Sequence, residues 1–184
     1  MQLIDAASAE FERVVRDLPP DSWSLSTPSE VTVRELVEHV VVGNRLSALL
    51  LVGMSRAEAM TDLDGDQLGD DPVAAVAAST ACQAAAFAAA TPDQVVSHPN
   101  GDITTSTFLR FRLVELVVHA WDLRRAAHLD EMLDADVVGQ LWTAVEPHLP
   151  DMLTFGAFGD GPSGTIPPNS TKQARLLDAF GRRP

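Results

Sequence analysis

Three residues of the sequence have side chains that could together hold one divalent cation. Glu115 and His119 are four residues apart, a spacing that places two side chains on one face of a helix, one turn apart. Two residues at this spacing can chelate a single metal ion, and a third ligand must then come from another segment. His39 is the best candidate, because it lies inside a second strongly apolar stretch. The pattern predicts a metal site between two facing helices.

The predicted donor set, two neutral imidazoles and one carboxylate, is that of open Zn²⁺ sites, in which the fourth position is free for water or substrate. Zn²⁺ bound by one carboxylate keeps a positive charge and stabilises an anion such as hydroxide or a thiolate. The alternative is a weak ion pair between Glu115 and His119 on a solvated helix. Ionisable groups in apolar surroundings are costly unless they are paired or bound, which favours ligation. Spacing and context alone leave both interpretations open.

The segments that carry these residues read as helices separated by short polar breaks. Apolar residues recur at helical spacing, and Thr32 with Glu35 has the signature of a capping box at a helix start. Period-2 alternation is scarce, so the sequence predicts an all-α fold, an antiparallel four-helix bundle with extra short helices, in a single domain over residues 1–184. Residues 93–106 are expected to form a loop or turn. Helices are expected over about 3–18, 33–52, 72–90, 107–128 and 134–148, with a last short helix capped by Ser170 and Gln173 that ends near residue 180.

The composition excludes several classes of protein. Among 184 residues, 26 are Asp or Glu and 13 are Lys or Arg, and the net charge of −13 opposes binding to nucleic acid or to an anionic membrane surface. The single cysteine, Cys82, excludes an internal disulfide and a cysteine-rich zinc module. It lies in an alanine-rich segment predicted to be a helix, and we expect its side chain to be buried in the protein core. The charged N-terminus and the lack of a long uninterrupted apolar run predict neither a signal peptide nor a membrane span. We therefore expect a cytoplasmic protein.

Two further acidic residues have spacings that suit the predicted site. Glu35 repeats the four-residue spacing towards the histidine of its own helix, but the capping box explains it without a metal. Asp122 lies three residues after His119 and could orient a ligand imidazole. It could equally cap a loop or pair with Arg124 or Arg125, and the sequence does not decide between these roles.

Other polar and aromatic residues are given structural roles by their context. Arg112 could meet an anionic substrate, but a surface ion pair is the favoured interpretation, and Asn44 is a weak candidate for a pocket. Trp121 and Trp142 are expected in the core. The acidic loop 62–71 does not match a calcium-binding loop, because the required glycine and glutamate are absent at their positions, so we expect a solvated loop.

Four segments carry a resemblance to known proteins: TPSEVTVRELVEHVVVGN (27–44), GDDPVAAV (69–76), FLRFRLVELVVHAWDLRRAAHL (108–129) and RLLDAFGRRP (175–184). In this order they resemble the mycothiol-dependent maleylpyruvate isomerase N-terminal-domain family, within the DinB/YfiT-like superfamily of metal-binding four-helix bundles. VHAWDL and GRRP are the most specific parts. In that family a histidine of the second helix and Glu-x-x-x-His before Trp-Asp bind a divalent metal, usually taken as zinc. The resemblance implies this role for His39, Glu115 and His119.

The chain also departs from the family pattern. Ser29 and Val31 stand where the family commonly has Cys and Trp, and we expect this change to alter packing rather than ligation. The isomerase that the chain resembles carries a second, C-terminal domain that contributes to its active site, whereas we expect the bundle to be the single domain of this chain. Isomerase activity on maleylpyruvate is therefore not carried over.

Three functions follow as expectations. The first is a zinc-dependent transferase or isomerase that uses a low-molecular-weight thiol, mycothiol, on a small electrophile, so the partners are a small-molecule thiol and an electrophile. The second is metal-assisted hydrolysis, with Glu35 or Asp122 as general base. The third is a non-enzymatic, metal-stabilised bundle that binds a ligand or a partner. Bundles of this superfamily often dimerise, so the resemblance leaves a homodimer open, and the sequence indicates no interface for it.

Overall fold

The fold is known from a computed structural model, which describes residues 2–99, 101–154 and 161–184. It is mostly helical and confirms the all-α bundle, with the long helices close to their expected bounds. The four long helices are α1 (Leu3–Asp17), α2 (Val33–Leu51), α4 (Pro72–Ala89) and α5 (Thr105–Ala126). The shorter elements are η1 (Ser22–Ser24), α3 (Arg56–Asp62), β1 (Val95–His98), β2 (Gly101–Thr104), α6 (Ala135–Val145), η2 (Glu146–His148), α7 (Leu149–Thr154) and α8 (Lys172–Ala179).

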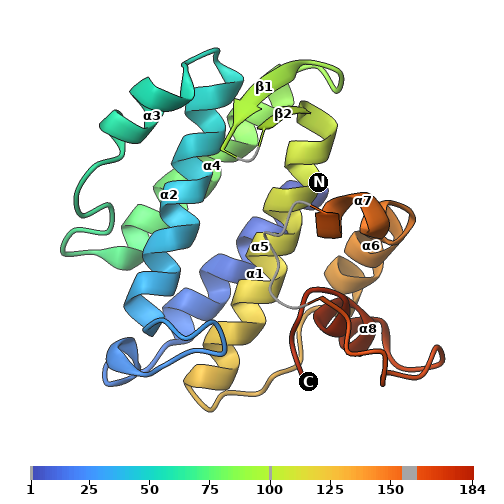
Figure 1. The fold of residues 1–184 in the computed structure, drawn as a ribbon. Coiled ribbons are helices and arrows are strands. Elements are labelled where there is room, and N and C mark those ends of the chain that lie inside the picture. The colour runs from blue at the N-terminus through green and yellow to red at the C-terminus, as the bar shows by residue number, and fades with distance from the viewer. Residues whose placement is uncertain (1, 100, 155–160) are drawn as a thin grey trace.

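The long helices form a bundle in which α1 and α2 each contact both α4 and α5 (Figure 1). Helices α2 and α5 run antiparallel, whereas α2 and α4 run in the same direction, because α3 and the loop after it return the chain to the start of α2 (Figure 1). Two contacts mark this return. Arg34 at the start of α2 pairs with Asp66 at 3.2 Å, and Gln94 Nε2 donates to the carbonyl oxygen of Leu51 at the end of α2. The antiparallel pair α2/α5 carries the candidate site.

Side-chain caps fix where the two helices of the site begin. The capping box at α2 is formed as expected: Thr32 Oγ1 accepts from the backbone N–H of Glu35, and Glu35 Oε2 accepts from the backbone N–H of Thr32 at 2.8 Å. Thr104 Oγ1 caps α5 by accepting from the backbone N–H of Thr107. The cap of α8 is Thr171, one residue after the expected Ser170, because its hydroxyl accepts from Ala174 N at 3.1 Å.

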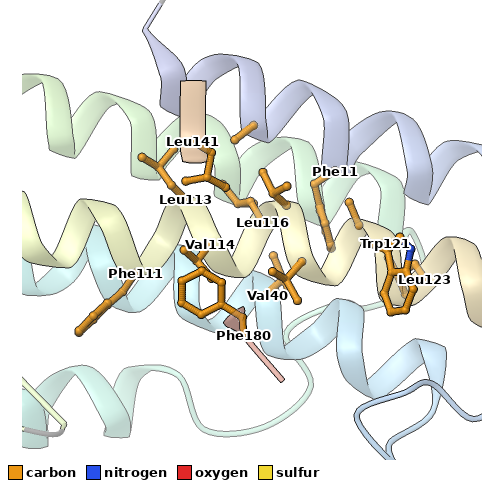
Figure 2. Packing of buried hydrophobic residues seen from close by; sticks show 14 of the residues in the cluster. Phe11, Val40, Phe111, Leu113, Val114, Leu116, Trp121, Leu123, Leu141 and Phe180 are labelled. Carbon is orange, nitrogen blue, oxygen red and sulfur yellow. The ribbon is translucent and has the colours of Figure 1, made fainter. Parts of the chain in front are cut away.

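Helix α5 passes through the centre of the core and is buried on nearly every side. Apolar side chains of α1, α2, α5, α6 and the segment after α8 meet in one cluster, which includes Phe11, Leu116 and Phe180 (Figure 2). Trp121 and Trp142 belong to it, with 1% and 5% of their surface exposed, which confirms their expected core position. The cluster holds α5 rigidly, so that side chains on its one open face are presented from a fixed backbone.

Residues 93–106 are not only a loop, as expected, but include an antiparallel hairpin in which Val95–His98 pairs with Gly101–Thr104. Val96 and Ile103 face each other across the two strands and are both buried. Strands of four residues give too few alternations for a period-2 pattern to be recognised. The hairpin matters for the site because its first strand ends at His98, which lines the pocket between α2 and α5.

Helix α4 turns its polar row inwards, contrary to the expectation for Cys82. Ser79, Thr80 and Gln83 are buried and bonded to other helices, so the alanine row with Cys82 is exposed. Helix α4 is also long and apolar enough to cross a membrane by length and composition, with a mean hydropathy of 1.4. One such helix is weak evidence for a membrane segment, and here its inward row is bonded within the bundle.

Candidate metal centre and its pocket

The structure brings His39, Glu115 and His119 together. His39 Nε2 lies 2.9 Å and His119 Nε2 lies 3.1 Å from the same carboxylate oxygen, Glu115 Oε2. The ligating atoms of the three residues lie within 4.8 Å of one another, and this is the one His/Cys/Asp/Glu cluster of metal-binding geometry within the described residues. Both imidazoles point the same nitrogen at one carboxylate, which is the convergence that a shared cation requires.

Charge holds this cluster together. Burial alone would raise the pKa of Glu115, but the positive charge of His119, hydrogen bonds from both histidines and the charge of Arg112 hold that pKa well below 4.5. Burial would lower the pKa of His119, but the carboxylates of Glu115 and Asp122 raise it from 6.5 to about 9. At neutral pH, Glu115 is therefore ionised and His119 is protonated. A cation bound by the same atoms would replace the protons between them.

Asp122 orients the imidazole of His119, which decides the alternatives that the sequence left open. Its Oδ2 atom accepts a hydrogen bond from His119 Nδ1 at 2.9 Å, so the other ring nitrogen points to Glu115. The side chain of Asp122 is fully buried. Burial would raise its pKa, but hydrogen bonds from His119 and Arg182 lower it below 3.8. The alternative pairing with Arg124 or Arg125 is not formed, since Arg124 lies beside Glu10 and Arg125 beside Glu131.

Arg182, sixty residues further along the chain, is the charged partner of Asp122. Its Nη2 atom lies 2.6 Å from Asp122 Oδ2 and its Nε atom donates to Asp122 Oδ1 at 3.0 Å. Nη2 also donates to Ser29 Oγ at 2.8 Å, and Ser29 Oγ donates to Asp122 Oδ2. The expectation that Ser29 affects only packing is therefore too narrow, because this hydroxyl belongs to the network that holds Asp122.

Gly181 turns the chain so that Arg182 reaches the site. The N–H of Arg182 donates to the carbonyl oxygen of Leu177, and the N–H of Gly181 donates to that of Asp178, which together form a Schellman motif at the end of α8. The motif places Gly181 in the left-handed region, with φ of 80°, where glycine has no steric penalty. The preceding residue, Phe180, is fully buried and anchors the turn.

Arg112 is buried behind the cluster, with 5% of its surface exposed, so the expectation of a surface ion pair is wrong. Its Nε atom donates to Gln83 Oε1 on α4 at 3.0 Å. Its Nη2 atom donates to Asn44 Oδ1 at 2.9 Å and to the carbonyl oxygen of Val40 at 3.3 Å, both on α2. These bonds replace water around the guanidinium. Asn44, expected as a pocket residue, instead holds Arg112 from behind the pocket wall.

The third nitrogen of Arg112 remains directed towards the cluster. Nη1 lies 4.0 Å from Glu115 Oε2 and makes no hydrogen bond to the described part of the chain. Gly43 makes room for it, because a Cβ atom at this position would collide with the guanidinium and lie 2.7 Å from Arg112 Cζ. A glycine inside a helix is destabilising relative to alanine. The role of Gly43 is to leave space for the guanidinium of Arg112.

The cluster lies in a pocket of about 860 Å³ between α2, α5, the hairpin and the C-terminal segment. Gly181 and Arg182 form part of its wall, and His98 and Phe108 form another part. His98 was not singled out by the sequence, where it reads as a turn residue. Its ring packs 5.2 Å from that of Phe108, and burial together with the charges of Arg112 and Arg56 lowers its pKa below 6.5. Both effects favour the neutral form of its imidazole.

The remaining predicted roles fall outside the cluster. Glu35 lines the pocket but keeps its capping role, so the interpretation without a metal is supported. In the acidic loop, Asp66 accepts from the backbone N–H groups of Leu68 and Gly69, and Asp71 caps α4. The loop residues contribute to no metal-binding cluster among the described residues.

A helical bundle with a histidine–glutamate–histidine cluster on its second and fifth helices has the architecture of a DinB/YfiT-like protein. The family model of the mycothiol maleylpyruvate isomerase N-terminal domain matches residues 4–124, about two thirds of the chain. The chain therefore belongs to this family. The matched range contains the three residues of the cluster and Asp122, whereas Arg182 lies outside it. Comparison with curated proteins and with solved structures gave no match.

Proposed function

We propose that the chain binds one divalent cation, Zn²⁺ in the first instance, through His39, Glu115 and His119, and that it activates the thiol of mycothiol against a small electrophile. The observation that carries the proposal is the convergence of the three donor groups within 4.8 Å in the wall of a large pocket. The family, which is named for a mycothiol-linked domain, supports the choice of thiol.

The residues present fit a catalytic rather than a closed structural zinc site. Two imidazoles and one carboxylate leave a coordination position for a substrate. Asp122 holds the second nitrogen of His119, as carboxylates commonly do for ligating histidines. The side chain of His39 is 57% exposed, so the cluster is reached from the pocket without any movement of the buried helix α5.

The proposed chemistry needs a thiolate and an electrophilic carbon. A divalent cation held by these residues supplies Lewis acidity, which stabilises the thiolate form of a thiol near neutral pH. In a transfer reaction the thiol loses its proton to solvent, sulfur forms a bond to the carbon, and the leaving group departs with its electron pair. In an isomerisation, sulfur adds to a carbon–carbon double bond and leaves again, so that the thiol is regenerated.

Metal-assisted hydrolysis is less well supported, because both proposed general bases are engaged elsewhere. Asp122 is fully buried, and its two oxygens accept from His119 and Arg182. Glu35 Oε2 accepts from the backbone N–H and the hydroxyl group of Thr32. Hydrogen bonds from Thr32 lower the pKa of Glu35, and those from His119 and Arg182 lower the pKa of Asp122, so both carboxylates are weakened as bases. A purely binding role for a metal-stabilised bundle is distinguished from thiol chemistry by the following experiment.

The test is electrophile conversion by the zinc-loaded full chain with mycothiol, against a panel of an epoxide, an alkyl halide and an unsaturated acid. We expect conversion of at least one class that requires both zinc and thiol. It should be lost in His39→Ala and kept in His148→Ala, a histidine outside the cluster. Strong thermal stabilisation by zinc with no conversion across the panel would favour the binding role. Conversion without thiol would favour hydrolysis.

The zinc-free chain is expected to lose stability between pH 6.5 and pH 9. The pKa of His119 is raised from 6.5 to about 9, so its charged form contributes stability that is fully present below pH 6.5 and is lost as the pH rises through 9. Zinc needs the neutral imidazole, so its affinity should rise over the same range. Urea unfolding and zinc titrations at both ends of the range measure the two effects. Equal unfolding free energies there would contradict the prediction.

Replacing Arg182 by alanine is expected to weaken zinc binding about tenfold, because Asp122 then no longer holds His119 in one orientation. Arg183→Ala is the matched control. Arg183 is the next arginine, its side chain is 52% exposed, and its ion pair is with Asp178 instead. Zinc affinity measured by competition with a chelating dye should fall only in Arg182→Ala. Equal affinities of the two variants would show that the C-terminal segment does not position the site.

A further inference from the structure

The pocket has two chemically different ends because α2 and α5 run antiparallel along it. On α5, pocket residues recur about one turn apart from Phe108 through Arg112 to His119, a distance of roughly 16 Å along the helix axis. On α2, the order is reversed, with His39 at the charged end and Leu46 at the other. The pocket is therefore elongated, with the donor cluster at one end and an apolar wall at the other.

The apolar end is built from side chains of four separate elements. Leu46 of α2, Met60 of α3, Phe108 and Phe111 of α5 and Pro99 after β1 line it. Met60 is 48% exposed, so its side chain is accessible from the pocket that it lines. His98 lies at the same end, where its ring packs against Phe108 and Phe111. The wall is therefore mainly apolar and suits a hydrocarbon body.

Arg112 lies between the two ends and offers one unsatisfied edge to the pocket. Two of its nitrogens are fixed by Gln83, Asn44 and the carbonyl oxygen of Val40, whereas Nη1 makes no hydrogen bond to a described residue and has Glu115 at 4.0 Å as its nearest charge. A guanidinium held in this way is preorganised to donate to an anion. When Glu115 ligates a divalent cation, its charge is shared and the charged end becomes net positive.

We propose that the pocket binds an amphipathic anion, with a carboxylate on Arg112 Nη1 beside the donor cluster and a hydrocarbon body against the apolar end. This inference deepens the proposed function, since it names the class of the small electrophile as an apolar compound that carries a carboxylate. It rests on the proposed function for the positive charge of the cluster, and on Arg112 for the orientation of the ligand.

The test is calorimetric binding of butyrate, hexanoate and octanoate to the zinc-loaded full chain, with 1-octanol and octylamine as charge controls. We expect the affinity to rise about fourfold for each methylene that is added within the series. Octanol and octylamine should bind at least tenfold more weakly than octanoate. Equal affinities for octanoate, octanol and octylamine, or no increase along the carboxylate series, would overturn the inference.

Substitutions at Arg112 and Gly43 distinguish binding of the carboxylate by Arg112 from direct binding of the carboxylate to zinc. Arg112→Gln should weaken octanoate about tenfold or more, whereas Arg110→Gln, on the same helix but outside the pocket, should not. Gly43→Ala, which displaces the guanidinium, should reproduce the loss if Arg112→Gln does not fold. Octanoate affinity that survives in folded Arg112→Gln or Gly43→Ala would overturn the inference.

The apolar end is tested by chain length. Leu46→Ser should weaken octanoate but leave butyrate unchanged, and Val52→Ser, at a position 76% exposed and outside the pocket, should affect neither. A separate zinc titration distinguishes this inference from the proposed function. Zinc binding without octanoate binding overturns only the inference, whereas Arg112-dependent octanoate binding in a chain that takes up no zinc overturns only the metal proposal.

Discussion

Glu115→Gln is expected to lower zinc affinity by about three orders of magnitude. Glu115 Oε2 is the atom that both imidazoles approach, at 2.9 and 3.1 Å, and it carries the only negative charge of the donor set. Zinc binding by protein sites contributes about 10–16 kcal/mol, and losing one of three ligands removes roughly a third of such a value. The measurement is zinc content after dialysis, together with competition against a chelating dye.

Glu35→Gln is the matched control for this prediction. Glu35 has the same four-residue spacing to a histidine, but its carboxylate accepts from Thr32 in the capping box and lies outside the cluster. We expect unchanged zinc affinity and a small loss of stability from the weaker cap. Equal zinc loss in both variants would mean that spacing alone, rather than the convergence on α5, determines the site.

The three residues of the cluster could be predicted because their spacing, their apolar context and the resemblance to a known family select the same positions. The spacing of Glu115 and His119 fixes a shared helix face, and the apolar context of His39 places it in a facing helix. The capping box at Thr32 also sets the start of α2, and therefore which of its residues face α5. Their assembly follows from helix geometry, and their role as metal ligands stays a prediction.

The surroundings of the cluster could not be predicted, because they depend on residues far apart in the chain. Asp122 is bonded to Arg182, and nothing in the sequence near either residue indicates this pairing. The available signal was Gly181 directly after an expected helix, which favours a Schellman turn, but the direction of the turned chain depends on the packing of Phe180. From the sequence, Arg112 is expected at the surface, because a single charged residue usually lies there.

Helix α4 illustrates why polarity alone misleads in a bundle. Its alanine-rich pattern has no strong apolar face, so the expectation that Cys82 is buried had little to support it. Hydrogen bonds to neighbouring helices orient α4: Arg112 donates to Gln83, and Asn44 donates to Ser79. Burying a guanidinium requires hydrogen-bond partners, and those partners turn the polar row of α4 inwards. The buried guanidinium of Arg112 therefore both lines the candidate pocket and sets the orientation of α4.

Asp122→Asn is expected to weaken zinc binding by about 10–100-fold and to destabilise the fold by roughly 3–5 kcal/mol. The carboxylate is the acceptor in each of its hydrogen bonds, and the donors are His119 Nδ1, Arg182 and Ser29. An amide nitrogen at either oxygen position would face a donor, and Arg182 would be left without its countercharge. Zinc titration and urea unfolding measure the two effects.

Asp178→Asn separates the effect on the metal from the general cost of removing a buried carboxylate. Asp178 is 6% exposed, pairs with Arg183 and accepts from the N–H of Ser163, but contacts no residue of the cluster. This variant should lose stability and keep its zinc affinity. A double-mutant cycle between Asp122→Asn and Arg182→Ala should give strongly non-additive zinc affinities, because both substitutions break the same support of His119. Additive effects would mean that Arg182 acts on the pocket independently of Asp122, and that the C-terminal segment shapes the wall without orienting the histidine.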